Sequence, residues 1–482
     1  MQAKFFRNLV FLVFLNILIK PFWIFGIDRT VQNVVGTELY GFYFTIINFV
    51  LLFEVFLDLG ITAFNNRNIA RNKDQLKSQF SRILPLRLML VFLFTLVVFG
   101  VAKFIGYDNS QLNLLIWVGL NQVLLSFVQY MRSNISGLLL LKTDSLISVL
   151  DRSLMILICS LLLWGNIFSE PFKIEWFVYA QTIAYGITMI VSTIVVLGNS
   201  GSIRLKFEWG FTKDLIKMSF PFAILTLVGG LFYRIDSVLI ERILTGSTGE
   251  IQSGVFAQSY RIVGAVNNFS LLFAVLLFPI FSNMIKNKQS IKELLFFAFS
   301  MILVFTSIII GICNSYAPEI LDLLYTESFS NGEQILKILI IGILGMSVSY
   351  VFGSLLTANG NINLLIVITS IGMLIDIVLN YILIPEYQAL GAAYASMSAH
   401  SIVLILLIIS VLYVFRIRFG VVLLSKIFSY LLILTALVYL FDMLNINWIL
   451  ELCLYTICGL VLAFLLRLLS LRQMIAYLQF KE

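Results

Sequence analysis

Five basic residues lie within or beside long apolar runs of the sequence. Lys20, Arg234 and Arg261 fall inside such runs, while Arg29 and Arg242 stand just beyond two of them. Ionisable groups are costly in a bilayer, so they usually face protein or water and mark function. We interpret the five as a basic ring that binds a phosphate or pyrophosphate group. The alternative is that these long side chains extend to the outer lipid head groups.

A second set of polar residues has the chemistry of an ion site. Asp376 and Asn380 are four residues apart and share one face of a helix. With Asp236 they would form an oxygen-ligand site for sodium or a proton site, and His400 would join as a protonatable group. The alternative is that Asp236 pairs with a cation, and that Asn380 and His400 form hydrogen bonds between helices. Four more charged residues of the apolar runs keep no assigned role: Glu54, Asp58, Asp151 and Arg152.

The runs that hold these residues are long enough to cross a membrane. Of the 482 residues, 60% are hydrophobic and 12% are charged, against about 25% charged in soluble domains. Backbone groups in lipid must be paired within a segment, so each span is a helix. We predict an all-α polytopic membrane protein with fourteen transmembrane helices, at residues 9–26, 41–64, 88–105, 112–130, 146–163, 176–197, 220–240, 255–280, 294–312, 335–356, 364–384, 390–415, 421–441 and 449–466.

Lysine and arginine are concentrated in alternate loops between these spans. The basic loops cover residues 67–82, 204–217, 286–292 and 416–426. Because cytoplasmic loops carry the excess of basic residues, the alternation predicts that both termini are cytoplasmic. It also accounts for the net charge of +7 without a nucleic-acid partner. All the loops are short, so no sizeable soluble domain is expected.

Short sequences recur at a nearly constant spacing. Gly41-Phe42-Tyr43 is echoed 213 residues later by Gly254-Val255-Phe256, and Lys20 is followed by Arg234 at a spacing of 214. The spacing pairs each span with the span six further on, so the two halves share one orientation, as in transporters with parallel repeats. We predict an N-terminal six-helix lobe at 1–197, a cytoplasmic linker at 198–218, a C-terminal six-helix lobe at 219–415, and two extra helices with a tail at 416–482.

The sequence contains no motif for nucleotide hydrolysis or catalysis. Residues 137–143 superficially resemble a phosphate-binding loop, but no glycine precedes Lys142. The four cysteines lie in apolar runs and show neither a disulfide framework nor a metal spacing. We therefore expect a protein that is not an enzyme and has no cofactor. Transport would draw on a Na⁺ or H⁺ gradient, the membrane potential or the substrate gradient.

Four short motifs resemble those of one family of polytopic membrane proteins. Residues 36–41, Gly-Thr-Glu-Leu-Tyr-Gly, resemble the Gly-Pro-Glu-x-Tyr-Gly stretch after helix one of polysaccharide-export flippases, with Thr37 in place of proline. Residues 57–60, Leu-Asp-Leu-Gly, resemble their Asp-Leu-Gly at the end of helix two, and residues 233–236 resemble the aromatic-x-x-Asp pattern of helix seven. The most specific match is Asn-Tyr-Ile-Leu-Ile-Pro at 380–385 followed by Gly-Ala-Ala at 391–393. Over residues 5–415 the chain resembles the Wzx-like O-antigen and polysaccharide flippases of the multidrug/oligosaccharidyl-lipid/polysaccharide (MOP) exporter superfamily.

This resemblance implies both a fold and a function. The fold would be MATE-like, and an undecaprenyl-pyrophosphate-linked oligosaccharide would move from the cytoplasmic to the periplasmic leaflet of the bacterial inner membrane by alternating access. A cationic cavity would bind the pyrophosphate. The related lipid II flippases carry a sodium site on helices seven, eleven and twelve, and Asp236, Asp376 and Asn380 would fill that role here, with the acid and amide of helix eleven in swapped order. The protein would act as a monomer among membrane lipids, with a polymerase and a chain-length protein of the same pathway as partners.

Three other functions are weighed against this one. A cation-coupled drug antiporter of the MATE type would need acidic and aromatic cavity residues, and it has no use for Lys20, Arg234 and Arg261. It also typically has twelve helices. A lipid II flippase would share the chemistry and carry a different glycan. A polytopic polymerase or glycosyltransferase would need a large loop or an exposed catalytic cluster, and the short loops argue against both.

Overall fold

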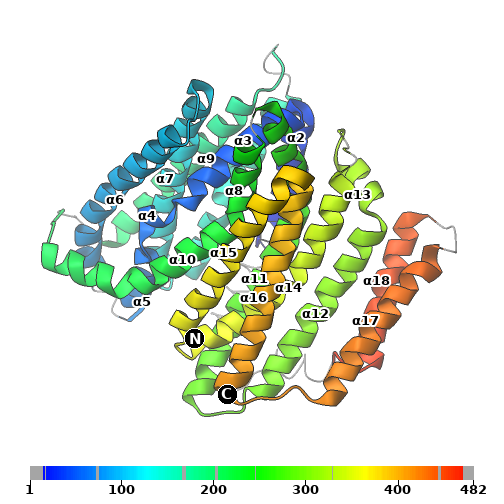
Figure 1. Cartoon of the computed structure of the whole chain (residues 1–482). Coiled ribbons are helices and arrows are strands. Elements are labelled where there is room, and N and C mark those ends of the chain that lie inside the picture. Colours follow the sequence, from blue (N-terminus) through cyan, green and yellow to red (C-terminus); the bar gives the residue numbers. More distant parts are fainter. Residues whose placement is uncertain are drawn as a thin grey trace. The chain divides into compact units, whose positions relative to one another are not determined.

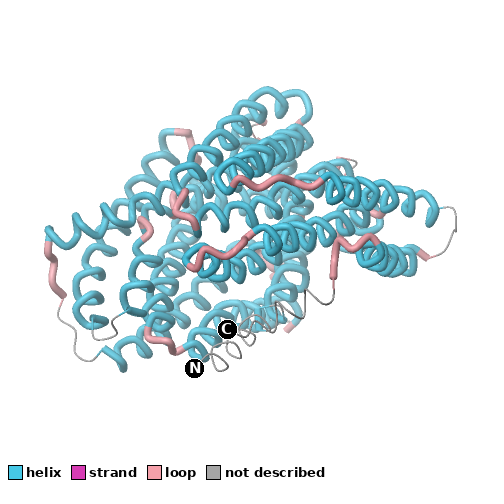
Figure 2. The backbone as a smooth tube through the Cα atoms, turned by 90° about the horizontal axis from the view of Figure 1, so that it is seen from below, coloured by secondary structure: helices cyan, strands magenta, loops and turns pink. Residues whose placement is uncertain are grey.

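The computed structural model of the chain is helical throughout its described part (Figure 1). It describes residues 15–470 apart from 17, 72–74, 166–169, 201–204, 245, 328, 330 and 443–446. No strand occurs among these residues, and the described connections between helices are short (Figure 2). The chain divides into two compact units, unit 1 at Met1–Ala257 and unit 2 at Gln258–Glu482.

Unit 1 is a bundle in which α7 packs against α3, α5 and α9, and α10 packs against α3. Its core-facing residues recur at helical spacing, as Ile46, Phe49 and Val50 of α3 do, and all three are buried. The elements are η1 (Phe22–Asp28), α2 (Arg29–Val35), α3 (Thr37–Leu52), α4 (Val55–Asp58), α5 (Ile61–Arg71), α6 (Leu76–Phe104), α7 (Asn109–Gly137), α8 (Leu141–Trp164), α9 (Ile174–Ser200), α10 (Trp209–Ile243) and the start of α11 (Ser247–Lys286).

Unit 2 is centred on α14, which packs against α12 and α16, while α16 also packs against α15. Glycine permits the close approach of α14 and α16, because a Cβ on Gly345 would lie 2.8 Å from the carbonyl oxygen of His400. The elements after α11 are α12 (Lys292–Ser315), α13 (Ala317–Leu324), α14 (Gly332–Ala358), α15 (Ile362–Tyr387), α16 (Ala389–Phe415), α17 (Val421–Asp442) and α18 (Trp448–Leu465). At one edge of the unit α17 and α18 run side by side and contact α12 (Figure 1).

The long helices account for the predicted membrane spans. In the described residues, 11 helices are long and apolar enough to cross a membrane. The helix before Gly36, the segment α3–α5 and helix α11 supply the other three of the fourteen predicted spans. Large apolar side chains such as Phe428 and Tyr413 are exposed, as expected of surfaces that face lipid. The predicted all-helical polytopic fold is thus confirmed.

The first helix is wound more loosely than the sequence suggested. Residues 9–14 and 17 of the predicted span lie outside the described part, and its described residues from 15 onward are helical. After Pro21, residues Phe22–Asp28 form a π-helical stretch that continues into α2. The helix ends at Gly36, whose φ of 88° is readily adopted only by glycine. π-helical turns are rare and are frequent at functional sites.

The second predicted span, at 41–64, is broken twice rather than continuous. α3 ends at Leu52, the short α4 ends at Asp58, and α5 begins at Ile61. Leu59 and Gly60 both adopt positive φ at the second break. The carboxylate of Asp58 accepts the backbone N–H of Thr62 at 3.1 Å, so it caps the first turn of α5. This local hydrogen bond competes with continuation of the helix and accounts for the second break within the span.

The two compact units do not coincide with the predicted lobes, which remain a prediction. The boundary between the units falls inside α11, whereas the sequence suggested a linker at 198–218. The physical reason is that α10 packs on α3, α4, α5 and α6 of the first predicted lobe. The first turns of α11 also pack on α3, at Gly41 and Gly254.

Candidate functional site

Lys20 lies half-buried on the helical segment that leads into η1. Asn16, one turn earlier, donates from Nδ2 to Ser148 Oγ at 3.4 Å, so this face of the first helix runs along α8. Within the described residues Lys20 forms no ion pair shorter than 4.0 Å. The charged groups near it are Asp151 and Arg152 of α8 and Arg132 of α7.

Arg152 is the neighbouring cation to which the sequence assigned no role. Its guanidinium carbon lies 5.3 Å from the ring centroid of Trp23 and 5.9 Å from that of Tyr185. Arg152 Nη1 also donates to the Tyr185 hydroxyl at 3.3 Å. The nearest carboxylate oxygen of Asp151 is 4.0 Å from Arg152 Nε, and the side chain of Arg152 is 28% exposed. Two aromatic rings therefore orient the guanidinium, while its ion pair is long.

We refer to Lys20, Trp23, Asp151, Arg152 and Tyr185 as the Lys20–Arg152 cluster. It holds two cations against one carboxylate, and Arg132 adds no net charge because it pairs with Asp144 at 2.8 Å. Like charges held together away from bulk water repel each other, and a bound anion relieves the repulsion. The guanidinium fork matches phosphate oxygens in geometry, and the ammonium adds a point charge. The cluster is therefore suited to a phosphate group.

Arg234 and Arg29, two more members of the predicted ring, also belong to unit 1. Arg234 of α10 lies within electrostatic range of Glu54, and Glu54 accepts a hydrogen bond from Gln122 Nε2 at 3.1 Å. Glu54 stands at the first break of the second span, just before α4. Arg29 donates from Nε to the carbonyl oxygen of Phe25 at 3.1 Å, within its own helix. Arg234 thus shares its surroundings with an acid that the sequence left without a role.

Arg242, another member of the predicted ring, contacts protein groups on several sides. It pairs with Glu241 at 2.6 Å, and its Nη1 donates to the carbonyl oxygen of Ile105 at 3.0 Å. Its guanidinium carbon lies 4.3 Å from the ring centroid of Tyr107. Glu241 in turn accepts from Gln111 Nε2 at 2.9 Å. These contacts join the end of α10 to the segment between α6 and α7.

Arg261 belongs to unit 2 and is buried. Its Nη1 donates to the Tyr325 hydroxyl at 2.5 Å, and the guanidinium carbon lies 5.6 Å from the ring centroid of Tyr325. The same hydroxyl donates to the carbonyl oxygen of Gln258 at 3.2 Å. Arg152 is thus a cation within electrostatic range of Lys20, while Arg29, Arg242 and Arg261 each bond to other groups of their own unit. The five-residue ring remains a prediction.

The predicted ion-site residues are all buried in the interior of the helix bundles. Asn380 Nδ2 donates to the carbonyl oxygen of Asp376 at 2.9 Å and lies 3.3 Å from Asp376 Oδ1. His400 of α16 is buried in the same unit, whereas Asp236 is buried in unit 1. Among the described residues, no three His, Cys, Asp or Glu side chains are grouped so as to hold a metal ion. Sodium or proton binding by Asp236, Asp376, Asn380 and His400 stays a prediction.

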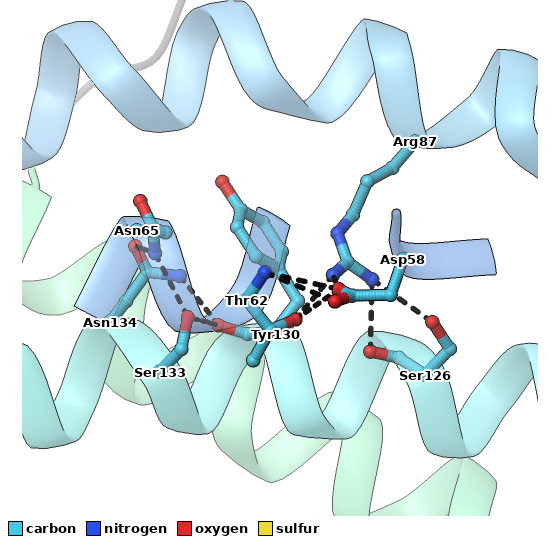
Figure 3. Close-up of polar contacts among 8 residues, drawn as sticks. All are labelled: Asp58, Thr62, Asn65, Arg87, Ser126, Tyr130, Ser133 and Asn134. Atoms are coloured by element: carbon cyan, nitrogen blue, oxygen red, sulfur yellow. Dashed lines mark hydrogen bonds and ion pairs between the residues drawn. The ribbon is translucent and has the colours of Figure 1, made fainter. Parts of the chain in front are cut away.

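An ion pair with several supporting hydrogen bonds joins Asp58 to Arg87 of α6 in unit 1 (Figure 3). Arg87 Nη1 donates to the carbonyl oxygen of Ser126 at 3.1 Å and to its hydroxyl at 3.0 Å, and Nη2 donates to Thr62 Oγ1 at 2.6 Å. The guanidinium carbon lies 4.4 Å from the ring centroid of Tyr130. Arg87 is 1% exposed. The pair connects the second break of the second span to α6 and α7.

The hydrogen bonding continues from this pair along α5. Asn65 Nδ2 donates to Ser133 Oγ at 2.9 Å and to Asn134 Oδ1 at 3.0 Å, as Figure 3 shows. A Cβ on Gly137 would lie 2.9 Å from the Cβ of Ile69, so α5 and α7 are also in close backbone approach. Asp58, Arg87 and this row of polar side chains therefore fix α5 against its neighbours, which is a structural role.

Sequence reasoning missed Arg87 because it stands one residue before the predicted span at 88–105. The structure extends this helix back to Leu76. A signal was present, because Phe80, Ile83, Arg87 and Leu90 recur at helical spacing and all four are buried. An arginine on the buried face of a helix needs a charge partner, and Asp58, which had no assigned role, is that partner.

The arrangement of helices is shared with solved transporters. The lipid II flippase MurJ, in an inward closed conformation, matches with a TM-score of 0.73 and 16% identity over 95% of this chain and 99% of that chain. An inward-facing multidrug resistance MATE family transporter of the MOP superfamily matches with a TM-score of 0.62 and 13% identity over 81% of this chain and 93% of that chain. A MOP superfamily transporter from Pyrococcus furiosus matches with a TM-score of 0.59 and 13% identity over 84% of this chain and 94% of that chain. The fold is therefore that of the MurJ and MATE transporters.

Sequence comparison assigns the family within this fold. The model of the polysaccharide biosynthesis protein family matches residues 7–285, which is more than half of the chain, so the chain belongs to this family. An uncharacterized membrane protein of Methanocaldococcus jannaschii, MJ1375, is 25% identical over 76% of this chain and 88% of its own length. The capsular polysaccharide biosynthesis protein CapF of Staphylococcus aureus is 24% identical over 38% of this chain and 45% of its own length. The predicted membership of a polysaccharide-related family is confirmed by this match.

Proposed function

We propose that the protein flips an undecaprenyl-pyrophosphate-linked oligosaccharide from the cytoplasmic to the periplasmic leaflet by alternating access. The observation that carries this proposal is the Lys20–Arg152 cluster, in which two cations and one carboxylate lie within electrostatic range of one another. Such a site would repel the cationic drugs that an antiporter carries, whereas it would attract a pyrophosphate group. The family and the fold support transport of a polysaccharide precursor.

We also propose the membrane in which the protein acts, its topology and its partners. It would be a multi-pass protein of the bacterial inner membrane with both termini in the cytoplasm, since the basic loops alternate along the chain. It would work as a monomer that is not an enzyme, beside a polymerase and a chain-length protein. Flipping would be coupled to sodium or protons, with Asp236, Asp376, Asn380 and His400 as the ion-binding residues.

Binding of the pyrophosphate group is the experiment that tests the proposed site. Undecaprenyl pyrophosphate added to the purified protein in detergent should raise its thermal unfolding midpoint, because a ligand that binds only the folded state stabilises it. Undecaprenol, which lacks the charge, should not. Lys20→Gln and Arg152→Gln should each abolish the shift, while Lys173→Gln, in an exposed ion pair with Glu170, should retain it. Equal shifts by both lipids would contradict the proposed site.

A further inference from the structure

The predicted sequence repeat has a direct counterpart in the contacts of unit 1. A Cβ on Gly41 of α3 would lie 1.9 Å from the carbonyl oxygen of Glu250, and a Cβ on Gly254 would lie 2.1 Å from the carbonyl oxygen of Thr37. Gly41 and Gly254 are 213 residues apart in the sequence, and so are Thr37 and Glu250. Gly41 therefore contacts Glu250, and its repeat equivalent Gly254 contacts Thr37, the repeat equivalent of Glu250. Such a reciprocal contact is the mark of a two-fold interface.

Polar side chains flank the two glycines on both sides. Gln32 Nε2 donates to the carbonyl oxygen of Gly254 at 3.1 Å, and the hydroxyls of Thr45 and Ser253 lie 2.8 Å apart. Gln32, Thr45 and Ser253 are all buried. We refer to Gln32, Thr37, Gly41, Thr45, Glu250, Ser253 and Gly254 as the glycine seam. It joins α2 and α3 to the first turns of α11 through bare backbone, hydroxyls and one amide.

The contacts of Arg242 form a second junction of the same kind. Arg242 and Glu241, at the end of α10, bind Ile105, Tyr107 and Gln111 between α6 and the start of α7. Like the glycine seam, this junction connects sequence of the first predicted lobe to sequence of the second. Both junctions fall in or beside the loops that are poor in lysine and arginine, which are predicted to lie on the outer side.

We propose that the glycine seam and the Arg242 junction together form the outer gate of the protein, which parts to release the substrate. The proposal rests on the proposed function, because a contact between predicted lobes is a gate only in a protein that works by alternating access. The chemistry of the seam suits repeated opening. Its amide, hydroxyls and backbone groups can exchange their hydrogen bonds for bonds to water at small net cost, and its glycines expose no apolar side chain when they separate.

This proposal gives Arg242 a role different from the one predicted from the sequence. Arg242 would hold the gate closed rather than bind the substrate as part of the basic ring. Arg29, at the equivalent position in the repeat, donates to a carbonyl oxygen of its own helix instead, so Arg29 and Arg242 have different kinds of partner.

A disulfide across the seam tests the gate. In a chain whose four native cysteines are replaced by alanine, Thr45→Cys with Ser253→Cys should cross-link on oxidation, because the two hydroxyls are 2.8 Å apart. Ser270→Cys with Ser347→Cys is the matched control. Those hydroxyls are also 2.8 Å apart and buried, but both lie in the second predicted lobe, on α11 and α14. Flipping of a fluorescent undecaprenyl-pyrophosphate saccharide is then measured in proteoliposomes.

We expect the oxidised Thr45–Ser253 variant to fall to the level of vesicles without protein, and reductant to restore it, which shows that the protein remained folded. The oxidised control should keep flipping. Flipping by the cross-linked seam at the control rate, or failure of the seam cysteines to cross-link at all, would overturn the proposal.

A second measurement keeps the gate separate from the choice of substrate. Ser253→Cys alone is labelled in intact cells with a membrane-impermeant maleimide, with and without Gly41→Ala. The added methyl group has no room against Glu250, so it should hold the seam open and speed labelling. Equal labelling rates would overturn the gate. If no variant flips the fluorescent lipid but Gly41→Ala speeds labelling, the proposed substrate is wrong and the gate stands.

Discussion

Arg87 of α6 and Asp58 at the end of α4 form an ion pair across the second break in the second membrane span. The same guanidinium stacks on Tyr130 and donates to Ser126 and Thr62 (Figure 3). The chain is therefore held in place at this break, because the buried Arg87 contacts Asp58 before the break, Thr62 after it, and Ser126 of α7. A broken helix is tolerated in a membrane only where protein groups satisfy its freed backbone.

Removing either member of this pair should destabilise the protein. Asp58→Asn leaves the buried guanidinium of Arg87 without its charge partner, which costs about 3–5 kcal/mol. Arg87→Met should cost less, because the side chain of Asp58 is 29% exposed and water can solvate its charge. The double variant should lose less than the sum of the two single losses, since neither charge is then stranded. Thermal unfolding in detergent measures all three. A single variant that unfolds with the wild-type midpoint would contradict the structural role.

The Lys20–Arg152 cluster should be required for transport. Lys20→Gln and Arg152→Gln each remove one charge-assisted contact, which contributes about 1.5–3 kcal/mol, so each should weaken substrate binding by about tenfold or more. Complementation of a strain that lacks the protein, corrected for membrane abundance, measures the effect. Lys173→Gln is the control and should complement fully. Wild-type complementation by Arg152→Gln would exclude that residue from the site.

Arg234 should also be required, through its position beside Glu54. Arg234→Ala should abolish complementation and leave membrane abundance near normal, because the change removes a charge without removing helix packing. Glu54→Gln in the Arg234→Ala background should restore stability that the single variant has lost, since no unbalanced acid then remains. Full complementation by Arg234→Ala would remove this residue from the mechanism.

The ion-coupling prediction depends on Asp376. Replacement of Asp376 by Asn preserves the shape of the side chain and removes its charge, so any sodium or proton dependence of flipping should disappear. Flipping in proteoliposomes with an imposed sodium or pH gradient measures this. An ion dependence that survives in Asp376→Asn would show that coupling occurs elsewhere.

The sequence predicted the fold well because its signals were long-range and repeated. Runs of apolar residues gave every membrane span, and the alternation of basic loops fixed their number. The breaks at Glu54 and Asp58 were missed because both residues lie inside an apolar run, where composition alone predicts a continuous helix. Only the contacts of Asp58 with Thr62 and Arg87 show why the helix stops.

The site was predicted in part. Lys20 was identified because a lysine in an apolar run is rare, but Arg152, which stands next to Asp151 in the sequence, was left without an assigned role. The structure shows that Trp23 and Tyr185 orient Arg152, and neither ring could be placed there from one sequence. Arg242 was interpreted as a member of the phosphate-binding ring, since its partners near Ile105 and Gln111 are more than 130 residues away in the chain.

The most direct test of the central claim is the location of lipid-linked glycans in cells depleted of this protein. Polyprenyl-linked glycans are extracted, and their leaflet is determined with a membrane-impermeant probe. Accumulation of a complete lipid-linked repeat unit confined to the cytoplasmic leaflet is the predicted result. Normal glycan export, together with increased sensitivity to cationic drugs, would contradict the claim and make the protein a drug antiporter of the same fold.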